Sequence, residues 1–337
     1  MSDAILYVSF GGPEKPDDIL PFLENVTRGR GIPRERLLEV AEHYHHFGGR
    51  SPINDQNWAI IGRLTALLDQ HGPKLPVYWG NRNWHPLLPD TVRQMKADGI
   101  TRAFVFLTSA FSSYSGCRQY LENIEQAKIA AVFPDLEIVK LRTYFNHPGF
   151  LEPFIDHTRA ALEELPNARL VFTAHSIPVS MAQTSAYESQ LREAAQRVAE
   201  NSGAKEFDLV WQSRSGAPHI PWLEPDILDH LTSLQKSDIR DVVIVPVGFI
   251  SDHVEVLYDL DTEAAARCAE LGIRMKRVAP PGSDPRFAAM IRELVVEKRE
   301  GLIPRTFAPS TPLLHTCYEG CCPGPPARMR TLQPVSG

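Results

Sequence analysis

Short apolar runs alternate with amphipathic stretches through most of this chain, and this alternation constrains the fold more than any other feature. Strands are predicted at 4–9, 75–80, 102–108 and 136–140 in the first half, and at 168–174, 207–212, 241–247 and 273–278 in the second. Helices are predicted between them at 16–26, 34–46, 54–71, 86–98, 117–130, 150–165, 184–202, 253–271 and 284–299. This order predicts an α/β fold of two Rossmann-like, doubly wound parallel-sheet domains.

Length and composition suit this division. The 337 residues, 43% of them hydrophobic, are enough for an N-terminal domain at 1–149 and a C-terminal domain at 150–301. Residues 302–337 are Pro-rich and lose the periodicity, so we interpret them as a tail. No internal sequence repeat accompanies the two similar orders of elements, so the predicted duplication rests on the order alone.

Charge and the N-terminal sequence limit the partners and the compartment. The formal net charge of −6 argues against a nucleic-acid surface, because phosphate binding needs a basic field. The chain enters a strand at once, and no apolar run is long enough to cross a bilayer. We therefore expect a cytoplasmic protein that binds no nucleic acid and has no membrane-spanning segment.

Four acidic residues, Asp252, Glu255, Asp259 and Glu263, follow the buried strand at 241–247 with three- and four-residue spacing. At helical pitch they share one face, where like charges repel one another. A solvated face normally mixes in Lys and Arg, and none interrupts this series. A path for metal ions or protons and an ordinary solvated face are both open interpretations.

His175 is the second candidate, because it lies where the predicted strand at 168–174 ends. Ligands of open α/β sheets bind beyond the carboxyl ends of the strands. A lone histidine at such a place is more often a structural hydrogen-bonding residue. Since Glu255 follows another strand of the same predicted sheet, the two side chains could face each other as an acid/base and metal pair.

These motifs resemble those of the ferrochelatases. The stretch Thr173-Ala174-His175-Ser176-Ile177-Pro178 matches the family's catalytic histidine motif, and the stretch from Val247 to Asp261 matches its acidic segment. Further matching stretches, in the same order, are Ser9-Phe10-Gly11-Gly12-Pro13, Gly48-Gly49-Arg50-Ser51-Pro52-Ile53, Tyr78-Trp79-Gly80-Asn81-Arg82 and Trp211-Gln212-Ser213-Arg214-Ser215-Gly216. The resemblance covers residues 4–300 and implies the chelatase fold, with the active site in a cleft between its halves.

The resemblance implies insertion of Fe(II) into a porphyrin. His175 would accept the pyrrole protons, Glu255 would be its carboxylate partner, and Asp259 and Glu263 would continue as a relay for protons or hydrated metal. The relatives carry a π-helical stretch in this segment. If iron has an axial protein ligand, His175 is the better candidate, because Phe10 stands where some bacterial relatives have tyrosine and cannot ligate iron.

Porphyrin contacts are also implied by the resemblance. Phe10 would pack on the macrocycle, Arg28 and Arg30 would bind propionates with forked hydrogen bonds, and Ser51 and Tyr114 would add hydroxyl groups. The alternative for the two arginines is that they solvate a glycine loop. The sequence Tyr44-His45-His46 differs from the Tyr-Arg-Arg of animal relatives, so the propionates need not be bound as in those enzymes.

The chain has five cysteines. Many ferrochelatases hold a 2Fe-2S cluster with three C-terminal cysteines and a distant one, and Cys317, Cys321, Cys322 and Cys117 occupy such positions. Unligated thiols, a zinc site and a regulatory disulfide remain alternatives, because the C-x3-C-C spacing departs from the animal pattern. Cys268 falls on the apolar side of the acidic helix and is interpreted as a core residue.

The identity of the porphyrin substrate is the most specific of these hypotheses. The N-terminal half and the tail resemble those of actinobacterial enzymes that act on coproporphyrin III, so we predict a coproporphyrin III ferrochelatase that hands its product to a downstream haem-synthesis enzyme. Protoporphyrin IX is the second candidate substrate. A cobalt or nickel chelatase of another tetrapyrrole, and a non-catalytic haem or porphyrin carrier, are the remaining alternatives.

Overall fold

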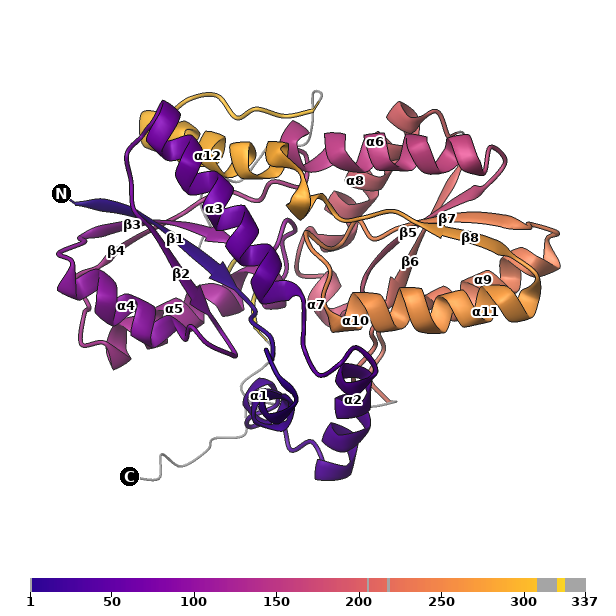
Figure 1. Cartoon of the computed structure of the whole chain (residues 1–337), viewed down its shortest axis with the longest axis horizontal. Helices are drawn as coiled ribbons and strands as arrows, with labels where there is room; N and C mark the ends of the chain where they lie inside the picture. The colour runs from indigo at the N-terminus through magenta and orange to yellow at the C-terminus, as the bar shows by residue number, and fades with distance from the viewer. Residues whose placement is uncertain (1, 205, 217–218, 308–319, 325–337) are drawn as a thin grey trace.

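Two parallel four-stranded sheets form the framework of the protein (Figure 1). The computed structural model describes residues 2–204, 206–216, 219–307 and 320–324. The first sheet has the order β2-β1-β3-β4 and consists of β1 (Asp3–Ser9), β2 (Val77–Asn81), β3 (Arg102–Leu107) and β4 (Glu137–Lys140). The second has the order β6-β5-β7-β8 and consists of β5 (Arg169–His175), β6 (Phe207–Gln212), β7 (Asp241–Val245) and β8 (Arg274–Arg277). The predicted α/β fold is confirmed.

Helices cover both faces of the first sheet. Side chains of β1 and β3 alternate between two apolar layers, because successive residues of a strand point to opposite faces. One layer contains Ile5 and Tyr7 and meets α3 (Ile53–His71) and α12 (Pro285–Glu300). The other contains Leu6 and Val8 and meets α4 (Leu88–Ala97) and α5 (Gln119–Ala130).

The second sheet is built in the same way. Leu170 and Phe172 of β5 face α6 (Pro148–Glu164) and α8 (Tyr187–Ser202), whereas Val171 faces α9 (Ile227–Lys236) and α11 (Ala265–Leu271). Helix α9 is absent from the sequence prediction. Its signals were present, since Asp226 caps it by accepting from the Leu228 N–H and its buried leucine and isoleucine residues recur at helical spacing.

The remaining helices are short or lie between the sheets. They are α1 (Ile19–Val26), α2 (Arg34–His46), α7 (Val179–Ala182) and α10 (Val254–Val256). Helices α1 and α2 project below the two sheets in Figure 1, and their apolar sides pack together with Val254 at the start of α10. The first and second halves of the chain therefore meet beside the predicted acidic segment.

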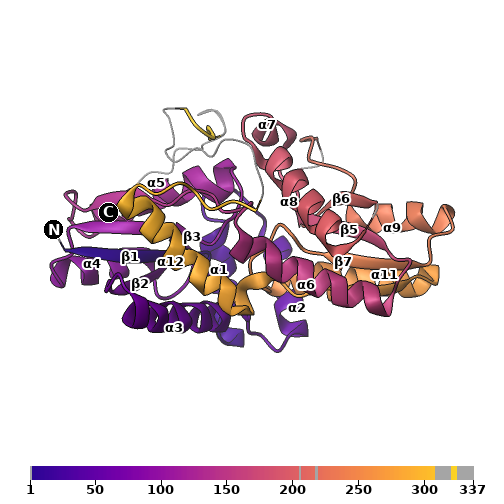
Figure 2. The same ribbon diagram turned by 90° about the horizontal axis from the view of Figure 1, so that it is seen from above.

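One continuous apolar cluster joins both halves, because it includes Tyr7 of the first sheet and Phe172 of the second. Helix α12, from the C-terminal part of the chain, packs against α3 beside the first sheet (Figures 1 and 2). The proposed boundaries at 149 and 301 stay predictions, and the α12 contact shows that the chain returns to its first half before it ends.

The strand orders place a site. In the first sheet β2 lies on one side of β1 and β3 on the other, so the strand order reverses between β1 and β3. The order of the second sheet reverses in the same way between β5 and β7. Ligands of open α/β sheets bind at such switch points, in a crevice at the carboxyl ends of the strands. Figure 2 shows the two sheets side by side with these ends toward the middle of the molecule. Within the described ranges no helix is long and apolar enough to cross a membrane.

Candidate active site

His175 is the last residue of β5, at the switch point of the second sheet. Its ring Nδ1 lies within hydrogen-bond distance of the Ser176 carbonyl oxygen, which can only accept, so Nδ1 carries the proton. In a neutral imidazole the lone pair is then on Nε2. The Tyr187 hydroxyl donates to the His175 carbonyl oxygen at 2.9 Å and fixes the backbone at this position. The ring thus offers one basic nitrogen in a defined direction.

Glu255 faces this nitrogen. Its Oε2 lies 3.9 Å from His175 Nε2, and the side chains of Glu255 and His175 are 50% and 35% exposed, so both remain accessible from solvent. Glu255 comes from α10, in the segment that follows β7, the neighbour of β5. The expectation that these two residues face each other is confirmed geometrically, because parallel neighbouring strands end at the same edge of a sheet.

A π-helix, Leu257–Ala264, continues from α10 and carries Asp259. The Asp259 carboxylate accepts hydrogen bonds from Ser213 Oγ and from Gln212 Nε2, the latter at 3.2 Å. Desolvation by burial raises the pKa of Asp259 to about 7, with a smaller upward effect of the Glu255 charge. Near neutral pH this carboxyl therefore exists in both protonation states, as a proton carrier requires.

The rest of the acidic series divides into two kinds of environment. Desolvation, and then the Asp226 charge, raises the pKa of Glu263, which lies farther along the π-helix. Asp252 instead pairs with Arg277 Nη1 at 2.9 Å, and the same guanidinium binds Asp261 at 2.6 Å. Asp252 is therefore an ion-paired member of the acidic series, because β8 supplies a cation from outside the helix.

Metal-binding geometry was also predicted for His175, Glu255, Asp259 and Glu263. Across the part of the chain that the structure describes, no three histidine, cysteine or acidic side chains come together as ligands of one ion. Of the four predicted groups, His175 and Glu255 lie 3.9 Å apart, and the charges of Glu255 and Glu263 both raise the pKa of Asp259.

A cationic and aromatic cluster lies at the switch point of the first sheet. The Arg82 guanidinium lies 5.8 Å from the Phe10 ring and 4.4 Å from the Tyr120 ring. Arg30 is close by, since desolvation and then the Arg82 charge lower its pKa, while Tyr114 has the opposite effect. The structure therefore brings the predicted Phe10, Arg30 and Tyr114 into one neighbourhood, with Arg82 in addition.

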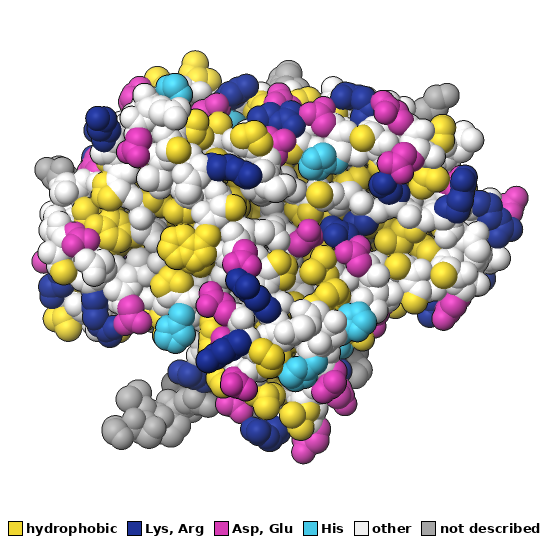
Figure 3. Space-filling model, viewed as in Figure 1, with side chains coloured by type: hydrophobic (Ala, Val, Ile, Leu, Met, Phe, Trp, Pro, Cys, Tyr) yellow, Lys and Arg dark blue, Asp and Glu magenta, His cyan; other side chains and the backbone are white. Residues whose placement is uncertain are grey.

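Other predicted porphyrin contacts are placed less directly. The Tyr114 hydroxyl donates to Glu122 Oε2 at 2.9 Å. Ser51 is only 3% exposed and lies beneath Gly12, where an added Cβ would come within 2.8 Å of the serine Cβ. Arg28 is exposed at the end of α1. On the face seen in Figure 3, basic and acidic side chains are interspersed around this lower part of the molecule.

Comparisons with known proteins agree with this geometry. The ferrochelatase family model matches residues 2–299. This chain belongs to the ferrochelatase family. A coproporphyrin III ferrochelatase of Nocardia farcinica is 52% identical over 95% of this chain and 96% of its own length. A coproporphyrin III ferrochelatase of Streptomyces coelicolor is 52% identical over 95% of this chain and 93% of its own length, and a ferrochelatase of Rhodopirellula baltica is 49% identical over 99% and 96%.

Solved structures support the fold of this ferrochelatase. The sirohydrochlorin chelatase SirB of Bacillus subtilis, in complex with cobalt, superimposes with a TM-score of 0.55 at 12% identity, covering 89% of this chain and 97% of SirB. At this identity the likeness concerns the two-sheet chelatase fold alone. The predicted fold and family are thus both confirmed.

The cysteines that were predicted as cluster ligands lie partly within the described residues. Cys321 and Cys322 are buried, with their sulfur atoms 3.8 Å apart, and two thiolates on one tetrahedral metal at about 2.3 Å lie roughly as far apart. Arg118 donates two hydrogen bonds to the Cys321 carbonyl oxygen, at 3.0 and 2.8 Å, which joins this segment to that of Cys117. Cys317 lies outside the described residues.

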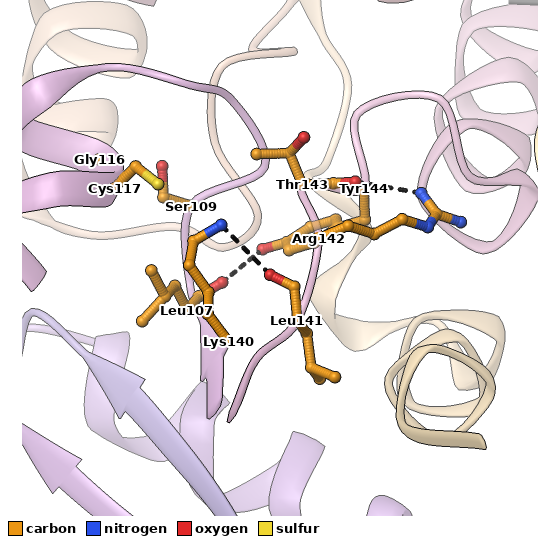
Figure 4. A pocket seen from close by; sticks show the side chains of 9 residues that line it. All are labelled: Leu107, Ser109, Gly116, Cys117, Lys140, Leu141, Arg142, Thr143 and Tyr144. Carbon is orange, nitrogen blue, oxygen red and sulfur yellow. Dashed lines mark hydrogen bonds between the residues drawn. The ribbon is translucent and has the colours of Figure 1, made fainter. Parts of the chain in front are cut away.

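Cys117 is itself buried, on a π-helical turn, Tyr114–Arg118, that follows β3. Behind this turn is a small cavity (Figure 4), where Lys140 Nζ donates to the Leu141 carbonyl oxygen at 3.2 Å and the Tyr144 hydroxyl donates to that of Leu107 at 3.0 Å. Cys268 is 1% exposed beneath the second sheet, and its interpretation as a core residue is confirmed.

Three contributors to the site received no role from the sequence, although Arg82 and Ser213 lie in stretches that match the family. Arg82 follows β2, and the rule that ligands lie beyond the carboxyl ends of strands could have found it. Ser213 follows β6 in the same way and has a positive φ of 60°. Arg277 had no such signal, since its role depends on β8 lying next to β7.

Proposed function

We propose that this ferrochelatase inserts Fe(II) into coproporphyrin III to give coproheme. The observation that carries the chemistry is the His175–Glu255 pair at 3.9 Å, at the edge of the second sheet that faces the first. The choice of porphyrin is supported by relatives that are 52% identical over nearly the whole chain and are named coproporphyrin III ferrochelatases. Protoporphyrin IX is the alternative substrate.

In this proposal His175 is the base. Its Nδ1 proton is engaged by the Ser176 carbonyl oxygen, so Nε2 accepts a pyrrole proton and the ring becomes an imidazolium. Glu255 stabilises that charge from 3.9 Å. Two protons leave the porphyrin in each turnover, so the base must pass on the first before it takes the second.

The series Glu255, Asp259 and Glu263 then serves as the route for protons and for hydrated iron. Asp259, whose pKa is about 7, both accepts and releases a proton near neutral pH. Carboxylate oxygens also suit a hydrated divalent ion, which needs transient rather than fixed ligands if it is to reach the porphyrin. Arg277 pairs with both Asp252 and Asp261 beside this route, so it offsets part of their negative charge and leaves Glu255, Asp259 and Glu263 as the carboxylates without this cation.

The macrocycle would lie against Phe10, with its propionates toward Arg30 and Arg82. Two guanidinium groups close together repel each other, and anionic propionates relieve that repulsion. Tyr114, Ser51 and Arg28 remain proposed contacts. Coproporphyrin III carries four propionates and protoporphyrin IX carries two, so a cationic cluster can form more ion pairs with coproporphyrin III.

We also propose a 2Fe-2S cluster on Cys117, Cys317, Cys321 and Cys322, supported by the paired sulfur atoms of the last two and the Arg118 hydrogen bonds. Such a cluster would tie the tail to the first domain. Iron and acid-labile sulfide in anaerobically purified protein, lost in Cys321→Ser, would test it. A cytoplasmic location, the domain boundaries and transfer to a downstream haem-synthesis enzyme also stay proposals.

The decisive experiment is anaerobic turnover with Fe(II), offering coproporphyrin III and protoporphyrin IX in parallel and following the porphyrin absorption bands. We expect faster conversion of coproporphyrin III, and a loss of about 10²- to 10⁴-fold in His175→Ala. Glu255→Gln should lose turnover while porphyrin binding, followed by fluorescence, is retained. Faster conversion of protoporphyrin IX would make that porphyrin the substrate. Conversion with cobalt or nickel but not with iron, or no conversion with any metal, would refute the proposal.

A further inference from the structure

Two glutamines cross between the halves of the molecule and hold the loops that lead to the proposed site. Gln56 Oε1 accepts from the Asp252 N–H at 3.0 Å, and its Nε2 donates to the Asp252 carbonyl oxygen at 3.0 Å. Gln190 Oε1 accepts from the Ser112 N–H at 2.7 Å, and its Nε2 donates to Ser112 Oγ at 3.0 Å. All four residues are half-buried.

These two contacts occupy equivalent places in the two halves. The sheet orders coincide when β1 to β4 are matched with β5 to β8. Helix α3 then matches α8, since each is the last helix before the second strand of its sheet. Gln56 is the fourth residue of α3 and Gln190 the fourth residue of α8, as their bounds show.

The loops that they hold are equivalent as well. Ser112 lies in the loop after β3, and Asp252 lies in the loop after β7. Each loop runs into a π-helical segment, Tyr114–Arg118 in the first half and Leu257–Ala264 in the second. Each half therefore holds the site-bearing loop of the other through the same position of the same helix.

Each loop carries a proposed functional group shortly after the clamped residue. Glu255 comes three residues after Asp252, and Tyr114 comes two residues after Ser112. On α8, Tyr187 lies one turn before Gln190 and binds the His175 carbonyl oxygen, so that helix is already tied to the base. The Asp252 loop is held by its backbone N–H and carbonyl oxygen, and the Ser112 loop by its backbone N–H and the serine Oγ, so each has little freedom to shift at the contact.

We propose that Gln56 and Gln190 are a pseudo-symmetric pair of positioning residues, which fix the Glu255 loop and the Tyr114 loop relative to the opposite half of the enzyme. Neither side chain is placed at the reacting atoms. Gln56 acts on metal insertion through Glu255, and Gln190 acts on porphyrin binding through Tyr114. This inference rests on the proposed function, because it assigns the two loops their roles.

The test uses Gln56→Met and Gln190→Met, which keep side-chain length and remove the hydrogen bonds, with Gln196→Ala as control. Gln196 is exposed on α8 and bonds only within that helix, to Glu200 at 2.7 Å. In turnover with Fe(II) and coproporphyrin III, we expect Gln56→Met to lower kcat about tenfold with KM for the porphyrin within about twofold. Gln190→Met should raise that KM about tenfold and change kcat little.

Hydrogen–deuterium exchange tests the clamps without turnover. Gln56→Met should speed exchange in peptides that cover 250–256 and leave 108–118 unchanged, and Gln190→Met should do the reverse. Gln56→Glu keeps the acceptor for the Asp252 N–H and should recover part of both protection and kcat. Faster exchange with unchanged kinetic constants in both variants would overturn the positioning role, whereas absence of turnover in the unaltered enzyme would instead refute the proposed function.

Discussion

Asp259 offers the sharpest test of the electrostatics of the site, by the substitution Asp259→Asn. Burial raises the pKa of this carboxyl from its usual value of 3.8 to about 7, even though Ser213 and Gln212 donate hydrogen bonds to it. Asparagine has nearly the same shape and no charge, and its amide oxygen accepts from the Ser213 hydroxyl. The substitution therefore removes the titration while it keeps most of the packing.

The protonation of Asp259 in the folded and unfolded states decides whether the free energy of unfolding rises or falls with pH. Between pH 3.8 and about 7 the unfolded chain has released this proton and the native protein still holds it, so folding takes up a proton. The free energy of unfolding of the unaltered protein therefore falls as pH rises through this window, and the loss is complete above about pH 7. The whole window corresponds to about 4 kcal/mol, and the part above pH 5 to about 2.5 kcal/mol, because one pKa unit is worth about 1.4 kcal/mol.

The assay is urea unfolding from pH 5 to pH 8. The Asn variant lacks this contribution, so its stability relative to the unaltered protein should rise by about 2.5 kcal/mol across the range. Asp69→Asn, an exposed change on α3, should show no such trend. A difference between Asp259→Asn and the unaltered protein that stays constant within about 0.5 kcal/mol would mean that Asp259 is ionised like an exposed carboxyl.

Two further substitutions test the supports of the site. Arg277→Leu should lower the free energy of unfolding by about 3 kcal/mol, because it leaves two aspartates without their cation at a side chain only 14% exposed. Arg274→Leu, at a side chain 71% exposed, should have a much smaller effect in the same urea titration. Gly248→Ala should cost about 2 kcal/mol and lower turnover, since its Cβ would lie 2.5 Å from that of Ala174, next to the base. Gly62→Ala meets nothing within 4 Å and should be neutral or stabilising in thermal unfolding, and equal effects of the two glycine changes would contradict the steric argument.

The central strands β1, β3, β5 and β7 were predictable to within about two residues because parallel strands covered on both faces are nearly continuous apolar runs. The strand at Phe207–Gln212 and the helix at Arg34–His46 begin and end where the sequence predicted. Helix α9 was missed because it is short and follows an irregular segment rich in proline and glycine. A short periodic stretch next to such a segment resembles a loop in sequence.

The histidine and acidic motifs were sufficient to predict that His175 and Glu255 meet, because both follow neighbouring strands of one sheet. The sequence could not show which acidic residues of this segment form ion pairs. Asp252 and Asp261 are bound by Arg277 only because β8 pairs with β7, and that pairing is a consequence of the sheet order.

The sequence alone determined the elements, the family and the chemical types present at the site, since these depend on local periodicity and on short motifs. Tertiary structure decided the environment of each group. The pKa of Asp259, the approach of Arg82 to Phe10, and the crossing of Gln56 and Gln190 all arise between residues far apart in the chain. Desolvation and hydrogen-bond geometry depend on what the fold places within a few ångströms of a side chain, and no local pattern encodes that neighbourhood.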